Sequence, residues 1–191
     1  MLELPIKKYL IIGSYALGVR PAADIDVVCY EADVECEFKR LDDYTGTFTF
    51  KGKKIELLFA DKQESFQRLL KEAIVSGLAS KVELFAIKAA HIVYPHRQWE
   101  KHIMDYHILK AMINYPQSEY ILRAIKLHKK STEDRIGKQR LPSLKNTTKE
   151  QFFDDAVKKY FVHDDIHQWF AHKEKPMYSY MQPDPELVDC S

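Results

Sequence analysis

The sequence has 191 residues, 46% of them hydrophobic and 30% charged, with 29 lysines and arginines against 28 aspartates and glutamates. This composition supplies a packed core for one ordinary domain or two small ones, and it argues against a disordered chain. The formal charge of +1 argues against a surface that binds nucleic acid all over. No apolar run approaches the roughly 20 residues that span a bilayer, and neither a secretory signal nor a C-x-x-C pair is present. We therefore expect a cytoplasmic protein that does not bind membranes.

The first 62 residues carry runs of β-branched and aromatic residues between turn residues. The predicted strands cover residues 7–12, 25–30, 47–50 and 55–59. Gly52 lies in a turn between the last two strands and predicts that they pair antiparallel. Together these segments predict a small mixed β-sheet as the core of residues 1–62.

After residue 62 the apolar residues recur three and four positions apart, as they do on one face of a helix. The predicted helices cover residues 66–74, 82–92, 99–114, 120–130, 152–161 and 166–172. Residues 131–148 are polar and predict a long loop. We therefore expect an α/β (α+β) protein in which the sheet core is followed by a helical domain over residues 63–175 and an irregular tail over 176–191.

A glycine, a serine and two aspartates mark the turn between the first two predicted strands. Gly13 and Ser14 end the first strand, and after nine intervening residues Asp24 and Asp26 flank Ile25 at the start of the next. Gly13 lets the backbone approach a phosphate, while the Ser14 hydroxyl and the amides of a short helix would donate hydrogen bonds to it. Asp24 and Asp26 project from one strand face. Two carboxylates this close repel each other unless a divalent cation lies between them, and oxygen ligands favour Mg²⁺ or Mn²⁺.

Glu56 adds a third carboxylate on a neighbouring strand. Its neighbours Ile55 and Leu57 are apolar and are expected on the opposite face of that strand. Taken alone, Glu56 fits a solvent-facing strand glutamate better than a ligand. Taken with the two aspartates, it completes the set that a two-metal displacement at phosphorus requires. Asp61, at the far end of the same strand, is a reserve third carboxylate.

The Gly-Ser-x9-Asp-Ile-Asp pattern at residues 13–26 resembles the signature of the DNA polymerase β-like nucleotidyltransferase superfamily. The residue types and spacing of this pattern are similar to those of the minimal nucleotidyltransferases, and the resemblance covers residues 8–60. It implies metal-dependent transfer of a nucleoside monophosphate from an NTP to an acceptor hydroxyl on a protein, a small molecule or an RNA 3′ end. The implied cofactor is Mg²⁺ or Mn²⁺.

The resemblance also implies roles for six residues. The implied catalytic residues and metal ligands are Asp24, Asp26 and Glu56, with Glu56 as the base. The implied nucleotide-binding residues are Gly13 and Ser14, which would cradle the triphosphate, and Arg20, which would contact a phosphate. One alternative function stays open from this half of the chain, namely a non-catalytic module that binds nucleotides or nucleic acid.

The helical half contains all eight histidines and supports a second alternative. Its suggestive set consists of His91, His102, Asp105, His107, His163, Asp164 and His167. Pairs three or four residues apart share one helix face, so two such pairs could bind a metal and form a hydrolase or ribonuclease. The other reading is that these groups pack a helical bundle through hydrogen bonds. Residues 101–107, 163–167 and 175–178 are similar to uncharacterised phage-encoded nucleotidyltransferase-like proteins, which implies no activity.

A basic segment runs from Arg123 to Lys149. It holds nine lysines and arginines against only Glu133 and Asp134, in a chain that is otherwise balanced. Such an excess suits a polyanion, so RNA, a protein acceptor or the nucleotide phosphates are candidate partners. A solvated helix face and loop would explain it equally well.

Overall fold

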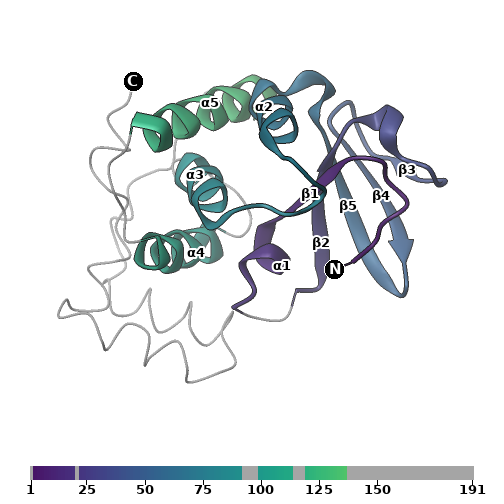
Figure 1. Cartoon of the computed structure of the whole chain (residues 1–191), viewed down its shortest axis with the longest axis horizontal. Helices are drawn as coiled ribbons and strands as arrows, with labels where there is room; N and C mark the ends of the chain where they lie inside the picture. Colours follow the sequence, from purple (N-terminus) through teal and green to yellow (C-terminus); the bar gives the residue numbers. More distant parts are fainter. Residues whose placement is uncertain (1, 20–21, 92–98, 114–118, 137–191) are drawn as a thin grey trace. The chain divides into compact units, whose positions relative to one another are not determined.

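The structure, a computed structural model, describes residues 2–19, 22–91, 99–113 and 119–136. The chain divides into two compact units, Met1–Leu84 and Phe85–Ser191. The first contains a β-sheet with helices and the second contains helices (Figure 1). The expected mixed α+β class is therefore confirmed, and the sheet unit extends past the composition change near residue 62.

The first unit is built on a six-stranded mixed sheet whose strand order is β3-β4-β5-β2-β1-β6. Its strands are β1 (Tyr9–Ile12), β2 (Asp24–Cys29), β3 (Lys39–Arg40), β4 (Thr45–Phe50), β5 (Lys53–Phe59) and β6 (Gly77–Leu78). The pairs β2–β5 and β1–β6 are parallel, and the other pairs are antiparallel. The central strands β1, β2 and β5 carry the largest share of buried residues, so they form a rigid base for side chains on their other face.

Short helices connect and cover this sheet. They are α1 (Gly13–Leu17), the 3₁₀ helices η1 (Glu31–Asp33) and η2 (Ala60–Lys62), and α2 (Glu64–Glu72). Phe66, Leu69 and Leu70 are buried on one side of α2, as the apolar period of its sequence predicts. Because α2 contacts β1 and β2, its apolar stripe and the buried strand residues form an apolar core that excludes water.

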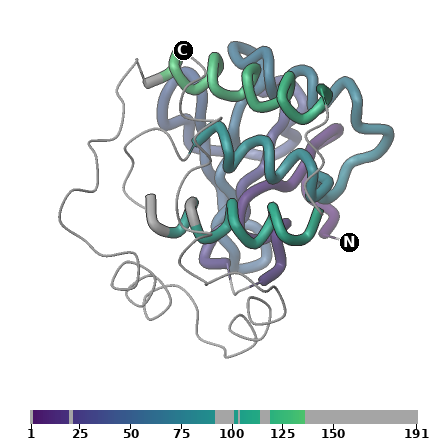
Figure 2. The backbone as a smooth tube through the Cα atoms, turned by 90° about the vertical axis from the view of Figure 1, so that its left-hand side faces the viewer, coloured from purple at the N-terminus to yellow at the C-terminus, as the bar shows by residue number. Residues whose placement is uncertain are grey.

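Three helices follow, namely α3 (Lys81–His91), α4 (Trp99–Met112) and α5 (Glu119–Ile136). Phe85 of α3 stacks on Tyr106 of α4 with ring centroids 5.1 Å apart, and Lys88 pairs with Asp105 at 2.9 Å. Figure 2 shows these two helices running side by side. None of the described helices is both long and apolar enough to cross a membrane.

Several element predictions need correction. The first strand begins at Tyr9 instead of residue 7, because the Lys7 amide donates to the carbonyl of Asp33, outside the strand pairing. The predicted loop at 131–148 is wrong at its start, since α5 continues to Ile136. Ser131 and Thr132 are buried in that last part of the helix. Burial outweighs the weak helix propensity of these two residues. The predicted helices at 152–161 and 166–172 and the tail lie outside the described residues.

Candidate active site

Asp24 and Asp26 lie on one face of β2. Burial alternates along the strand start, because Ile25 and Val27 are fully buried while both aspartates are only half-buried. This alternation follows from the two-residue period of a strand, which sends successive side chains to opposite faces. The structure thus places the two carboxylates on one face of the strand, as the sequence predicts.

Glu56 lies directly across from Asp26. The parallel register of β2 and β5 pairs Asp26 with Glu56 and Asp24 with Lys54. Ile55 is fully buried behind Glu56, as is the residue after it, so the glutamate faces the same side as the two aspartates. Three carboxylates from two adjacent strands therefore share one face of the sheet.

Gly13 packs against the carboxylate of Asp26. Antiparallel pairing sets Ile12, the last residue of β1, beside Asp26, so the chain turns into α1 at this carboxylate. A Cβ atom at position 13 would lie 1.9 Å from Oδ2 of Asp26, and the backbone there has φ of +69°. Both observations require glycine, because a side chain would collide and the left-handed conformation would be strained. Ser14, the next residue, is buried at the start of α1.

Lys54 supplies a positive charge on the same face. Its ammonium forms a hydrogen-bonded ion pair with Oε1 of Glu56. This hydrogen bond and the charges of Glu56, Asp24 and Asp26 raise the pKa of Lys54 above its usual value. The ammonium thus stands where a cation would balance the three carboxylates. The sequence analysis missed this residue, although its position two before Glu56 on a strand was a sufficient signal.

Lys81 fixes the C-terminal end of α1. Its Nζ donates to the backbone carbonyls of Ala16 at 3.0 Å and Leu17 at 2.7 Å, which have no partner inside the short helix. Burial lowers the pKa of the Lys81 ammonium. Gly18 ends the helix in the left-handed conformation, with φ of 74°. Nothing local in the sequence indicated Lys81, because the contact joins residues far apart in the chain.

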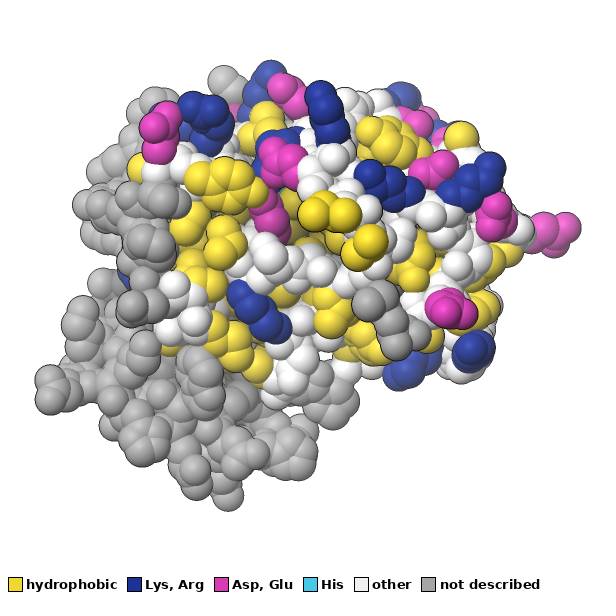
Figure 3. All heavy atoms as spheres, viewed as in Figure 1, with side chains coloured by type: hydrophobic (Ala, Val, Ile, Leu, Met, Phe, Trp, Pro, Cys, Tyr) yellow, Lys and Arg dark blue, Asp and Glu magenta, His cyan; other side chains and the backbone are white. Residues whose placement is uncertain are grey.

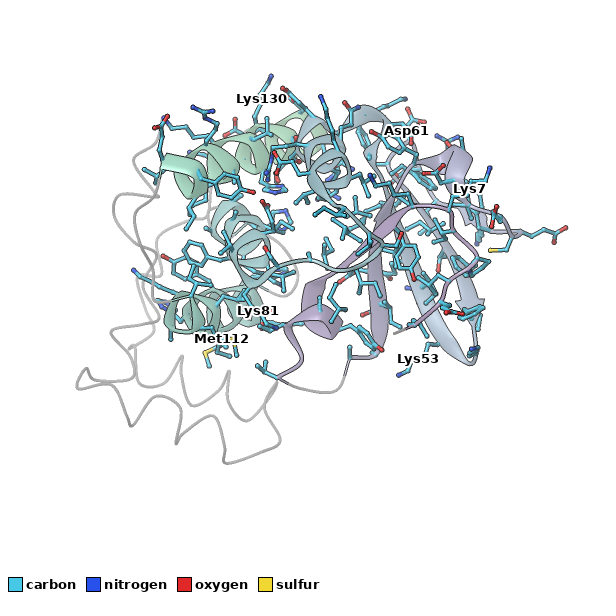
Figure 4. All side chains as sticks on the ribbon, viewed as in Figure 1. Lys7, Lys53, Asp61, Lys81, Met112 and Lys130 are labelled. Atoms are coloured by element: carbon cyan, nitrogen blue, oxygen red, sulfur yellow. The ribbon has the colours of Figure 1, made fainter. Side chains whose placement is uncertain are left out.

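Asp61, the reserve third carboxylate, is not brought to this face. Arg20 lies outside the described residues. Asp61 follows β5 at the end remote from Lys53, as Figure 4 shows, and its Oδ2 accepts a hydrogen bond from the Glu31 amide at 3.0 Å. Asp61 therefore holds a 3₁₀ helix in place and does not serve as the reserve third carboxylate.

The described residues contain no group of three His, Cys, Asp or Glu side chains arranged as a metal site. On the carboxylate face, the Lys54 ammonium is paired with Glu56. The chemistry of the donors nevertheless fits Mg²⁺ or Mn²⁺, since all three side chains offer hard oxygen ligands. Asp24, Asp26 and Glu56 are the residues that would hold such an ion, with one lysine ammonium present as a stand-in cation.

The histidine and acid set of the helical half lies partly in the described residues. Asp105 is fully buried on α4 and pairs with Lys88, whose Nζ also lies 3.1 Å from Nδ1 of His102. These contacts tie α3 to α4 inside the protein and leave Asp105 without access to solvent. Of the other members, His163, Asp164 and His167 lie outside the described residues.

The basic segment is only partly a surface. On α5, Lys129 is buried, whereas Lys126 and Lys130 are exposed and Arg123 pairs with Glu119 at 2.9 Å. Figure 3 shows basic and acidic side chains interspersed on the face that it presents. The part of this segment after Ile136 lies outside the described residues.

Comparisons with known proteins bear on the second half of the chain. No curated protein and no solved structure matches the sequence. One family model, described as a domain of unknown function (DUF7275), matches residues 83–191, and the carboxylate face lies before this region. Because the match covers more than half of the 191 residues, the chain belongs to this family of unknown function.

Proposed function

We propose that this protein is a metal-dependent nucleotidyltransferase that transfers a nucleoside monophosphate from an NTP to an acceptor hydroxyl. The observation that carries the proposal is the register of β2 with β5, which sets Asp26 opposite Glu56 and leaves Asp24 on the same face. Gly13, which closes on Asp26 at the start of α1, supports it.

The charge on this face supports a cation-dependent reaction. Asp24, Asp26 and Glu56 place three carboxylates on this half-buried face, and Lys54 adds one ammonium. Like charges on adjacent strands destabilise a sheet. A purely structural role therefore does not account for this arrangement of carboxylates. A divalent ion would remove the repulsion, and when bound it would supply charge neutralisation at the triphosphate and activation of the acceptor.

The residues of the chain would divide the remaining work. Asp24 and Asp26 would hold the cation, and Gly13 and Ser14 would leave room for the phosphates at the start of α1. The acceptor oxygen would attack the α-phosphorus, and the bond from that phosphorus to the bridging oxygen would break to release pyrophosphate. Glu56 would take the proton of the acceptor hydroxyl. Lys81 would keep the α1 turn in position through its two carbonyl contacts.

The acceptor follows less directly from the structure. The exposed lysines of α5 and the basic residues that follow it suit an RNA or an acidic protein surface. A cytoplasmic location would supply the NTP, Mg²⁺ and both kinds of acceptor. We therefore treat the acceptor as an RNA 3′ end, a protein or a small molecule, to be separated by experiment.

The test incubates the full chain with Mg²⁺, cell extract and each of four labelled NTPs, while pyrophosphate release is measured. Transfer of label to one class of molecule is expected for the wild type and for Asp61→Asn, which changes a carboxylate remote from the site. Asp26→Asn should abolish it. Absence of transfer with every NTP, together with tight binding of NTP, would contradict the proposal and favour a non-catalytic binding module.

A further inference from the structure

We infer that Lys54 is a resident counter-ion that competes with divalent cations for Asp24, Asp26 and Glu56, so that it sets the metal affinity of the site. This inference rests on the proposed function and deepens it, because it concerns how the same site is controlled.

The placement of Lys54 is specific. It is paired in register with Asp24, it lies two residues before Glu56 on the same face of β5, and it forms the ion pair with that glutamate. The charges of Asp24 and Asp26 also act on its ammonium. The Lys54 ammonium thus contacts Glu56 and lies in register with Asp24, on the face that the three carboxylates share.

An ammonium and a divalent ion compete for the same oxygen atoms. Oε1 of Glu56 receives the Lys54 ammonium, so an ion bound by all three carboxylates has to displace it or bind against its charge. Displacement is feasible because the Lys54 side chain is 52% exposed and has room to move into solvent.

The chemistry of the substrate explains the use of such a lysine. The polyphosphate of an NTP is the anion that would accept the displaced ammonium, so a metal ion bound to a nucleotide would meet less competition than a free ion. The lysine would therefore couple metal binding to nucleotide binding and disfavour an occupied metal site without substrate.

Lys53 provides a matched control. It is the preceding residue of β5, it is exposed, and its alternation with Lys54 places it on the opposite side of the strand. Replacing either lysine by methionine removes one positive charge and keeps the length of the side chain. Only Lys54→Met removes the charge from the carboxylate face.

The experiment measures Mn²⁺ binding to the nucleotide-free, full-length chain by electron paramagnetic resonance. We expect Lys54→Met to bind Mn²⁺ about two- to fivefold more tightly than wild type, because the substitution removes a half-exposed ion pair that competes with the metal. Lys53→Met should bind as wild type does. Lys54→Gln is a second variant that removes the charge with a polar side chain and should behave as Lys54→Met does.

Three outcomes decide the inference. Tighter binding in both Lys54 variants, lost when Asp26→Asn is added, supports it. Unchanged or weaker binding in the Lys54 variants, with wild-type binding still abolished by Asp26→Asn, overturns the inference and leaves the proposed function standing. Absence of any Mn²⁺ binding that depends on Asp26 overturns both.

Discussion

Gly13 leaves the space that the Asp26 carboxylate fills, since a Cβ atom at position 13 would lie 1.9 Å from its Oδ2. Gly13 therefore controls the position of one candidate metal ligand, in addition to making the turn from β1 into α1. A glycine usually explained by phosphate access thus has a second role that is internal to the protein.

Gly13→Ala should impair function well beyond its effect on backbone strain. Gly18→Ala is the matched control, because Gly18 also has a positive φ, +74°, but a Cβ there would meet nothing within 4 Å. Each alanine should cost about 1 kcal/mol of stability for the left-handed conformation. Gly13→Ala should in addition displace Asp26 and lower nucleotidyl transfer at least tenfold, as measured by pyrophosphate release. Equal activity of the two variants would contradict this role of Gly13.

Lys88→Met should destabilise the protein strongly. Lys88 and Asp105 form an ion pair in which the side chains are 6% and 0% exposed, so removing the lysine takes an ion-pair partner away from a fully buried carboxylate. The expected loss is about 3–5 kcal/mol in the free energy of unfolding, measured by urea denaturation. Lys88→Met combined with Asp105→Leu should recover much of it, because no buried charge remains.

The exposed pair of Arg123 with Glu119 is the control for this effect. Both side chains are largely exposed, at 78% and 87%, so Arg123→Ala should change stability by less than about 1 kcal/mol. If Lys88→Met were as mild as Arg123→Ala, the buried pair would contribute little to the packing of α3 on α4.

The strand pattern of the first unit was predictable because its signals are local. Gly52 between two alternating segments predicted the β4–β5 hairpin. In the structure residues 47–50 pair with residues 53–56 in the expected antiparallel sense. The alternation around Ile25 likewise predicted that Asp24 and Asp26 share a face. Such patterns depend on the period of a strand and need no knowledge of distant contacts.

The contacts that complete the candidate site were not predictable in the same way. Lys81 reaches α1 from a helix far along the chain, and β6 has only two residues, whose pairing with β1 depends on the folded arrangement. Lys88 lies on a predicted helix, where a lysine is ordinarily expected to be exposed. Its burial follows only from the position of Asp105 on another helix.

Cys29 should be unreactive in the folded protein. Burial raises the pKa of the Cys29 thiol to about 12, helped by the nearby charge of Asp33, so almost none is thiolate at neutral pH. Cys36 is only half-buried, and burial raises its pKa less severely. In a Cys190→Ser background, a maleimide reagent should label Cys36 first, and Cys29 only after denaturation, as mass spectrometry of peptides would show. Fast native labelling of Cys29 would contradict its burial.

Stability should fall as the pH is lowered below about 6.5, because of His107. Its side chain is 3% exposed, and burial lowers its pKa well below the ordinary value of 6.5, with a smaller contribution from Lys110. Between the two pKa values the unfolded chain binds one proton more than the folded chain, so acid favours unfolding. The stability is fully present above 6.5 and is lost at up to about 1.4 kcal/mol per pH unit below it.

Urea titrations between about pH 5.5 and 7.5 measure this dependence. His107→Gln keeps a neutral polar side chain at the position. It should reduce the slope of the unfolding free energy against pH by an amount equivalent to nearly one bound proton, whatever its effect on stability at neutral pH. Other groups titrating in this range contribute equally to both proteins, so the difference between the two slopes reports His107 alone. Identical slopes would show that His107 takes up its proton in the folded state as readily as in the unfolded chain.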